Sequence, residues 1–364
     1  MIVLNSDDYF MCLSRALNQN SKKIFKLLER FETPKNVFEA ERSELLDVKG
    51  ISEKNADSII LSKNNADMWL YELDKENVRF VSINNSQYPS LLRKIENPPV
   101  GLYVKGNLPK AEDRLVSIIG SRRCSEYGRL VAERISSELA QNGVWVVSGM
   151  ARGIDSAANW AAVKNGGKTA AVLGFGHANC YPAENRGLMR EIGEKGCLIS
   201  EYPPYSSAET YHFPRRNRII AAVSEITVIV EASKKSGTII TANYAIDYGR
   251  TVMAVPSNIT SSTGTGTNEL IKNGCAVVMN ADDIFFELGI KKTKEKPERK
   301  HTEEESVLSA EEQKVLNFIG MEPVRLEYIL NKTGFPVQKL QALLLMLEIR
   351  GFIQKLPGDR FIIK

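Results

Sequence analysis

The segment LVSIIGSRRCSEYG, residues 115–128, decides the fold. It begins with a run that is apolar on both faces, Leu115–Ile119, and continues through a glycine-bearing loop into a helical pattern over Gly128–Gln141. The next segment, VWVVSGMARGID at residues 144–155, repeats this arrangement. Strands that are apolar on both faces are typical of a parallel sheet that helices cover on each side. The two segments therefore predict neighbouring strand–loop–helix units.

The same pattern continues through the middle of the chain, where short β-branched runs alternate with helical stretches. Repeated strand–loop–helix units of this length imply right-handed crossover connections between parallel strands. The sequence therefore predicts an α/β domain with a central Rossmann-like, doubly wound sheet over residues 76–288. Its further strands are predicted at Val144–Val147, Thr169–Leu173, Cys197–Ser200, Ile226–Val230, Thr251–Val255 and Ala276–Met279.

The central region is flanked by segments of a different character. Residues 1–75 carry apolar residues at three- and four-residue spacing, which predicts an all-helical domain of the SAM or helix-hairpin-helix type. Residues 289–305 are densely charged and predict a linker. Residues 306–364 predict a winged helix, because helical stretches precede two strand-like runs around a Pro-Gly-Asp turn. The helical stretches are Ser309–Ile319, Val324–Asn331 and Val337–Arg350.

Composition narrows the class of protein. The 364 residues are 43% hydrophobic and 25% charged, as in a soluble globular chain of about two or three domains. The net charge of +4 permits a polyanionic partner without indicating one. Five scattered cysteines without a C-x-x-C pair favour free thiols in a reducing compartment. Since neither a secretory signal nor a membrane-spanning run of ~20 apolar residues is recognisable, we expect a cytoplasmic protein.

The loops after the predicted strands combine small residues with arginines. In an open α/β sheet such loops lie at the carboxyl edge and lead into helix N-termini, whose free N–H groups hold anions. The first loop does not have G-x-G-x-x-G spacing and so does not support dinucleotide binding. Several such loops at one edge predict a shared anion pocket. Its candidate residues are Gly120, Ser121, Arg122, Ser148, Gly149, Arg152, Gly174, Gly176, Arg215, Asn217, Arg218, Ser236, Gly237 and Thr238.

Phe213 stands next to this basic cluster in the sequence. Its ring is a candidate stacking surface for an unpaired base. Taken singly, a phenylalanine in such a pattern is more often part of a hydrophobic core. Tyr127 and Tyr181 are expected to pack or to orient loops.

The ordered series GSRRCSEYG, SGMARGID, GFG, SEYPP, FPRRNRIIAAVS, EASKKSGTIITA and GTNELIKNG resembles the DNA-processing protein A family, also called DprA or Smf. The resemblance covers about residues 80–280, and the flanking domains resemble an arrangement common in that family. It implies a protein that binds single-stranded DNA, protects incoming DNA during natural transformation and loads the RecA recombinase onto it. It also implies a homodimer formed through the Rossmann-like domain.

The resemblance also implies roles for single residues. The arginine of the G-S-R loop, which binds DNA phosphate in the family, is Arg122, and the phenylalanine implicated in DNA contact is Phe213. Family members often carry a lysine where this chain has Thr210, and Arg215 or Lys234 is a candidate to compensate. The loops that shape the family's pocket match Gly120, Ser148, Gly149, Gly174 and Gly176.

The flanking domains leave two alternatives each. Residues 46–56 match the turn of a helix-hairpin-helix, which either presents backbone N–H groups to DNA phosphates or only holds the helical domain together. The third helix of the winged helix carries only Lys339 and Arg350, with Glu348 opposing them. A contact with protein is therefore at least as well supported as insertion into a DNA groove.

A nucleotide phosphoribohydrolase-like enzyme is the alternative function, because related sheets hold phosphate in the same way. Such hydrolysis needs a carboxylate beside the sugar, yet residues 239–243 after the Ser236–Thr238 loop contain no acid. Asp155, Glu201 and Glu231 are expected to cap helices or to pair with arginines. The three histidines are dispersed, and no Walker sequence is present. We therefore expect a non-catalytic binding protein without cofactor or metal.

Overall fold

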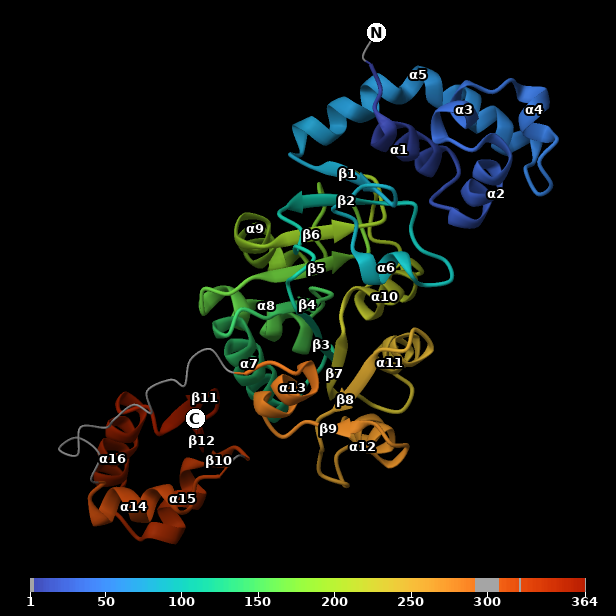
Figure 1. Cartoon of the computed structure of the whole chain (residues 1–364). Coiled ribbons are helices and arrows are strands. Elements are labelled where there is room, and N and C mark those ends of the chain that lie inside the picture. The colour runs from blue at the N-terminus through green and yellow to red at the C-terminus, as the bar shows by residue number, and fades with distance from the viewer. Residues whose placement is uncertain (1–2, 292–307, 321, 364) are drawn as a thin grey trace. The chain divides into compact units, whose positions relative to one another are not determined.

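The computed structural model describes residues 3–291, 308–320 and 322–363. It divides into two compact units, of which the first comprises Met1–Cys124 and Gly128–Lys291 and the second Ser125–Tyr127 and Lys292–Lys364. Residues 292–305 of the predicted linker lie outside the described residues. The predicted combination of a helical N-terminal domain, a Rossmann-like sheet and a winged helix is confirmed (Figure 1).

Five helices form the N-terminal part of the first unit. Polar caps set their starts: the Asn5 side chain accepts from two backbone N–H groups of α1, and Ser52 caps the long α5. Gly50, at φ +98°, turns the chain just before that cap. Phe10 and Leu27 are fully buried between these helices. The helices are α1 (Ser6–Ala16), α2 (Ser21–Phe31), α3 (Pro34–Glu39), α4 (Arg42–Leu46) and α5 (Glu53–Lys75).

The central sheet has nine strands in the order β1-β2-β6-β5-β4-β3-β7-β8-β9. From β6 to β9 every neighbouring pair is parallel, and each predicted strand is present with ends within two residues of the prediction. The strands are β1 (Arg79–Ser82), β2 (Gly101–Gly106), β3 (Leu115–Gly120), β4 (Trp145–Ser148), β5 (Thr169–Leu173), β6 (Cys197–Ser200), β7 (Ile226–Glu231), β8 (Thr251–Ala254) and β9 (Ala276–Val277).

Strands β1 and β2 were not predicted from the sequence. They extend the sheet beyond β6, and both pairings, β1 with β2 and β2 with β6, are antiparallel. The fully buried Tyr103 of β2 packs in the same cluster as the N-terminal helices. This extension therefore joins the helical domain to the sheet (Figure 1).

Alternate residues of the central strands face different helices. Ala170 and Val172 of β5 belong to a cluster with helix α10, whereas Ala171 and Leu173 pack in a cluster with helices α8 and α9. Helices therefore cover both faces of the sheet (Figure 1). The helices of this domain are α6 (Ser90–Arg93), α7 (Glu126–Gln141), α8 (Ile154–Lys164), α9 (Arg186–Lys195), α10 (His212–Val223), α11 (Gly237–Asp247), α12 (Thr265–Lys272) and α13 (Ala281–Leu288), with a 3₁₀ turn at Ala183–Asn185.

The strand order reverses next to β3. Successive strands run outward from β3 through β4 and β5 to β6, whereas β7, β8 and β9 run outward on the other side of β3. The loops that leave β3 and β7 therefore diverge to opposite faces and open a crevice at the carboxyl edge. This topological switch point is the place where open α/β sheets bind ligands.

The second unit contains the winged helix, with a three-stranded sheet in the order β10-β12-β11. The predicted helix over Val324–Asn331 is wrong at its start, because Val324 and Arg325 pair with β12 as a short strand. Within the residues that the structure describes, no helix is long and apolar enough to span a membrane. The elements are α14 (Ala310–Leu316), β10 (Val324–Arg325), α15 (Leu326–Thr333), α16 (Val337–Ile349), β11 (Ile353–Leu356) and β12 (Arg360–Ile363).

Candidate nucleic-acid interface

A cavity of about 440 Å³ opens at the switch point, between the loops after β3 and β7 and the starts of α8 and α11. We call it the switch-point pocket. Of the residues that line it, Asp155 is the only acid, whereas Arg122, Arg123 and Arg216 are basic. Seven of the predicted site residues line this pocket: Gly120, Ser121, Arg122, Asn217, Ser236, Gly237 and Thr238.

Close backbone packing shapes the β3 loop. A Cβ atom on Gly120 would lie 2.6 Å from Cγ1 of Ile154, so this position has no room for a side chain. The Ser121 N–H donates to the Glu231 carbonyl oxygen at 2.8 Å, and the Ser121 hydroxyl accepts from the Arg123 N–H at 3.1 Å. The first bond holds the β3 loop against the end of β7, and the second fixes the turn within the loop. The pocket wall is therefore built before any ligand arrives.

Arg122 projects from this loop beside the ring of Phe213. Its guanidinium carbon lies 5.5 Å from the ring centroid, within cation–π range. The Phe213 ring also lies 5.4 Å from the ring of Tyr181. Arg122 is exposed, and neither it nor Arg123 forms an ion pair within the described residues. The pocket mouth therefore combines unneutralised positive charge with an aromatic surface.

Gly174 makes room for Phe213, because a Cβ atom there would lie 2.9 Å from Cδ1 of that ring. We expect Gly174→Ala to displace the ring and to weaken binding of single-stranded DNA by about 3- to 10-fold, part of the effect of losing one base–aromatic stack. Fluorescence anisotropy with a labelled oligonucleotide measures this change. Gly187→Ala is the matched control, because a Cβ atom at Gly187 meets nothing within 4 Å. Equal affinities of the two variants would contradict this role of Phe213.

Three of the predicted arginines do not line the switch-point pocket. The Arg218 guanidinium donates to Glu201 Oε1 at 2.7 Å and to the Asn97 carbonyl oxygen at 2.8 Å. Arg215 donates to the same carboxylate oxygen at 3.2 Å and to the carbonyl oxygen of Gln19 in the helical domain. The expectation that all four predicted arginines share one pocket is therefore wrong, because Arg122 lines the switch-point pocket and the other three do not.

The third, Arg152, forms an exposed ion pair with Glu184, in which Nη2 donates to Oε2 at 3.0 Å. Exposed pairs of this kind contribute little to stability and are readily exchanged for another anion. Lys234, a candidate to compensate for Thr210, likewise pairs with Glu269 at 3.3 Å. Both cations lie at the surface, where the anionic group of a ligand can replace their carboxylate partners.

Ser148, Gly149 and Gly176 lie in the interior of the domain and support the loops from there. All three are buried, and the Ser148 hydroxyl donates to the Ile118 carbonyl oxygen at 2.7 Å. A Cβ atom on Gly176 would lie 2.0 Å from the Pro203 carbonyl oxygen. These residues therefore shape the loops rather than present polar groups to solvent.

Arg216 is the functional candidate that the sequence reasoning missed. It is 3% exposed, and its Nη1 donates to the carbonyl oxygens of Gly149, at 2.7 Å, and Val172. Burial lowers the pKa of Arg216 to about 10, and the Asp155 carboxylate raises it. Burial raises the pKa of Asp155, whereas Arg216 lowers it. Through its bonds to the Gly149 and Val172 carbonyl oxygens, Arg216 connects the ends of β4 and β5 at the floor of the switch-point pocket.

A sequence signal for this role exists. Arg216, Ile219, Ile220 and Val223 recur at three- and four-residue spacing and form the buried face of α10. Arg215 and Arg218 lie off this face. Helical periodicity could therefore have separated the structural arginine from its two neighbours.

The helix-hairpin-helix turn of the helical domain retains both of its alternatives. Val48, Ile51 and Ala56 of the helix-hairpin-helix turn are buried, so the turn contributes to the core of the helical domain. Two lysines also approach it: Lys23 Nζ donates to Asn55 Oδ1 at 2.6 Å, and Lys26 Nζ lies 3.5 Å from the position of a Cβ atom on Gly50. The turn thus has both a packing role and nearby positive charge.

In the winged helix, the two cations predicted for the third helix, Lys339 of α16 and its C-cap residue Arg350, both form ion pairs. Lys339 bonds to Glu311, and Arg350 Nη1 donates to Glu312 Oε1 at 2.9 Å. The same helix exposes Leu345 and Ile349 to solvent. Exposed apolar side chains on this helix, together with cations that are already ion-paired, favour a contact with protein over insertion into a DNA groove.

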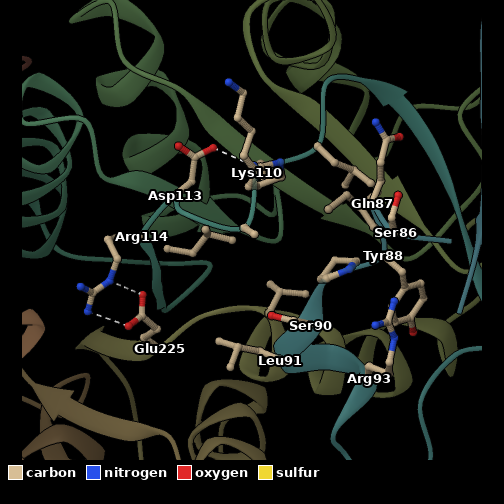
Figure 2. Close-up of a pocket in the computed structure, with 18 residues that line it drawn as sticks. Ser86, Gln87, Tyr88, Ser90, Leu91, Arg93, Lys110, Asp113, Arg114 and Glu225 are labelled. Carbon is tan, nitrogen blue, oxygen red and sulfur yellow. Dashed lines mark hydrogen bonds and ion pairs between the residues drawn. The ribbon is translucent and has the colours of Figure 1, made fainter. Parts of the chain in front are cut away.

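A cavity of about 540 Å³ lies at the opposite, amino edge of the parallel strands (Figure 2). Nε and Nη2 of Arg114 donate to the two Glu225 oxygens at 2.7 Å each, and the Asp113 carboxylate accepts the backbone N–H of Lys110 at 2.8 Å (Figure 2). None of the predicted site residues lines this cavity. The bidentate pair therefore links the starts of β3 and β7 on the side away from the candidate interface.

The fold and the site define a Rossmann-like protein with a basic, glycine-lined switch-point pocket, flanked by a helix-hairpin-helix segment and a winged helix. Three family descriptions match the chain: DNA recombination-mediator protein A over residues 79–289, the DprA winged helix domain over 298–359, and the SAM-like helix-hairpin-helix tandem over 20–62. The chain belongs to the DNA recombination-mediator protein A family, also called DprA or Smf.

Individual relatives agree with this assignment. Protein Smf of Synechocystis sp. is 31% identical over 97% of this chain and 98% of its own length. The DNA processing protein DprA of Streptococcus pneumoniae is 40% identical over 59% of this chain, and its X-ray structure superposes with a TM-score of 0.68 over 79% of this chain and 99% of that chain. DNA processing protein A of Helicobacter pylori, whose structure is described for its single-stranded DNA binding mode, is 28% identical with a TM-score of 0.52, over 58% of this chain and 97% of that chain.

Proposed function

We propose that this chain is a non-catalytic protein that binds single-stranded DNA at the switch-point pocket. The observation that carries the proposal is the pairing of an unneutralised guanidinium, Arg122, with the ring of Phe213 at a pocket mouth built from glycine-rich loops. Positive charge attracts the backbone of a strand, and an aromatic face stacks an unpaired base. The single-stranded DNA binding mode described for the Helicobacter pylori relative supports the same ligand.

Within this proposal the predicted arginines, the Ser121 and Ser236–Thr238 loops and Phe213 have separate roles. Arg122, Ser121 and the Ser236–Thr238 start of α11 hold phosphate, because the helix N-terminus adds free N–H groups to the arginine. Phe213 stacks a base. Arg152 contacts the strand at the rim, whereas Arg215 and Arg218 act through the loop that their ion pairs with Glu201 hold in place.

The cellular role is proposed on family membership. We propose that the protein protects incoming single-stranded DNA and loads the RecA recombinase onto it in natural transformation or recombination, in the cytoplasm. We also propose a homodimer formed through the Rossmann-like domain. Ile240 and Ile246 of α11 and Phe286 of α13 are exposed apolar side chains of that domain and are candidate contacts between two copies.

A phosphoribohydrolase-like enzyme is the second candidate, supported by Asp155 in the wall of the same pocket. Asp155 is 6% exposed and accepts the N–H of Ala151, in the loop that precedes α8, at 3.4 Å. Its carboxylate also faces the buried Arg216 charge. These contacts favour a structural role over attack on a sugar.

Titration of the full chain with single-stranded and duplex oligonucleotides of one sequence tests the proposal. We expect tighter binding of the single strand and a fall in affinity as salt rises, because bound phosphates release counterions. Each phosphate contact contributes a slope of about −0.7 in the plot of log affinity against log salt for single strands. Preference for a particular duplex sequence, or cleavage of a nucleoside monophosphate under the same conditions, would contradict it.

A further inference from the structure

A cavity of about 810 Å³ lies where the helical domain meets the central domain, and its walls are aromatic. Trp69 of α5 stands in one wall, and Tyr202, Tyr211 and His212 stand in the other. The rings of Tyr202 and His212 stack with centroids 3.8 Å apart, and Tyr211 meets His212 edge-on at 4.5 Å. We call this cavity the aromatic cleft.

Two side chains of the cleft carry buried polar atoms that have no hydrogen-bond partner within the described residues. They are the hydroxyl of Tyr202, which is 2% exposed, and Nη1 of Arg15, whose guanidinium lies 4.6 Å from the Trp69 ring centroid. Leaving such atoms unsatisfied costs free energy, so native structures seldom do so without a reason. Neither atom is exposed in this structure, so a ligand that both donates and accepts hydrogen bonds would satisfy them only once the side chains around them move. The edge of a nucleobase has both kinds of group.

The charges of the cleft favour an uncharged ligand group over a phosphate. Arg15 pairs with Glu72 at 2.6 Å, and Arg215 shares the Glu201 carboxylate with Arg218, so both guanidinium groups of the lining already have a carboxylate partner. Glu209 adds an exposed carboxylate to the lining. Flat, uncharged rings suit such a site, because aromatic side chains stack bases without regard to sequence.

The first turn of α10 connects the cleft to the switch-point pocket. His212 lines the cleft, and the next residue, Phe213, lies under Arg122 at the pocket mouth. Successive helical residues point about 100° apart, so the two rings face different sides of the same turn. Tyr211, 67% exposed, stands at the rim of the cleft beside this turn. A strand that leaves the pocket over α10 therefore meets the aromatic cleft next.

We propose that the aromatic cleft binds unpaired bases of the same single strand whose phosphates occupy the switch-point pocket. This inference rests on the proposed function, and it adds a second base-binding site to which the helical domain contributes Trp69. The DNA footprint of one chain therefore extends from the Rossmann-like domain onto the helical domain.

Oligothymidylates of graded length, titrated against the full chain, test this inference. We expect affinity to rise with length once the strand reaches the cleft. Tyr211→Ala and Trp69→Ala should remove this gain, weakening binding of the longer strands about 5- to 100-fold, as loss of a base–aromatic stack does. Binding of the shortest strands should stay unchanged. Tyr71→Ala is the matched control, because Tyr71 is exposed on the same helix α5 but does not line the cleft.

Quenching of tryptophan emission gives a second measurement that does not depend on the stability of a variant. We expect longer strands to quench the wild-type emission, and Trp69→Phe to lose most of this quenching. If Tyr211→Ala and Trp69→Ala bind longer strands as the wild type does, the cleft is not a base site, whereas the proposed function stands. If Arg122→Ala binds the shortest strands as tightly as the wild type does, the proposed function itself fails.

Discussion

Replacement of Arg122 by alanine is expected to weaken binding of single-stranded DNA by about 10- to 150-fold. The range corresponds to the loss of about 1.5–3 kcal/mol from hydrogen bonds that involve a charged group. Arg122 is exposed and projects from a loop whose backbone is held by Ser121 and Glu231, so the fold does not depend on its side chain. Anisotropy titrations over a range of salt concentrations measure both the affinity and the number of phosphate contacts.

Two variants sharpen the test of Arg122. Arg122→Lys should recover only part of the affinity, because an ammonium keeps the charge but cannot bind phosphate bidentately. Arg134→Ala is the matched control, since Arg134 is an exposed arginine of α7 that pairs with Glu138 and does not line the pocket. Equal losses in Arg122→Ala and Arg134→Ala would show that only net charge matters and would contradict a specific phosphate site.

Replacement of Arg216 by alanine is expected to lower the free energy of unfolding by about 3–5 kcal/mol, as removal of one partner from a buried charge pair does. The variant leaves the Asp155 carboxylate buried without its facing charge and removes the donor to the Gly149 and Val172 carbonyl oxygens. Chemical denaturation followed by circular dichroism measures this loss.

A double-mutant cycle isolates the coupling between the two buried charges. If Arg216 and Asp155 stabilise each other, the loss in the combined variant Arg216→Ala and Asp155→Asn should be smaller than the sum of the single losses. Additive losses would show that Arg216 acts only through its bonds to backbone carbonyl oxygens. A stability of Arg216→Ala equal to that of the wild type would contradict its role at the pocket floor.

Much of the architecture could be predicted because it follows from local patterns. Apolar runs such as Thr169–Leu173 and Cys197–Ser200 coincide with β5 and β6, since a strand buried on both faces has few places for polar residues. Strands β1 and β2 escaped prediction because they are antiparallel additions, and β2, which begins at Gly101 and ends at Gly106, is not part of a strand–loop–helix unit. The short strand β10 escaped because only its pairing with β12 distinguishes it from a helix start.

The sequence by itself determined where the pocket lies. In a parallel sheet the loops after the strands meet at one edge, so glycines and arginines in those loops indicate a common site without any knowledge of contacts. The tertiary structure alone decided which arginines reach it. Arg215, Arg216 and Arg218 lie within four positions, yet their partners come from two different loops: Glu201 from the loop after β6 and the Gly149 carbonyl oxygen from the loop after β4. Partners that come from separate loops depend on the packing of the whole domain, which no local sequence pattern predicts.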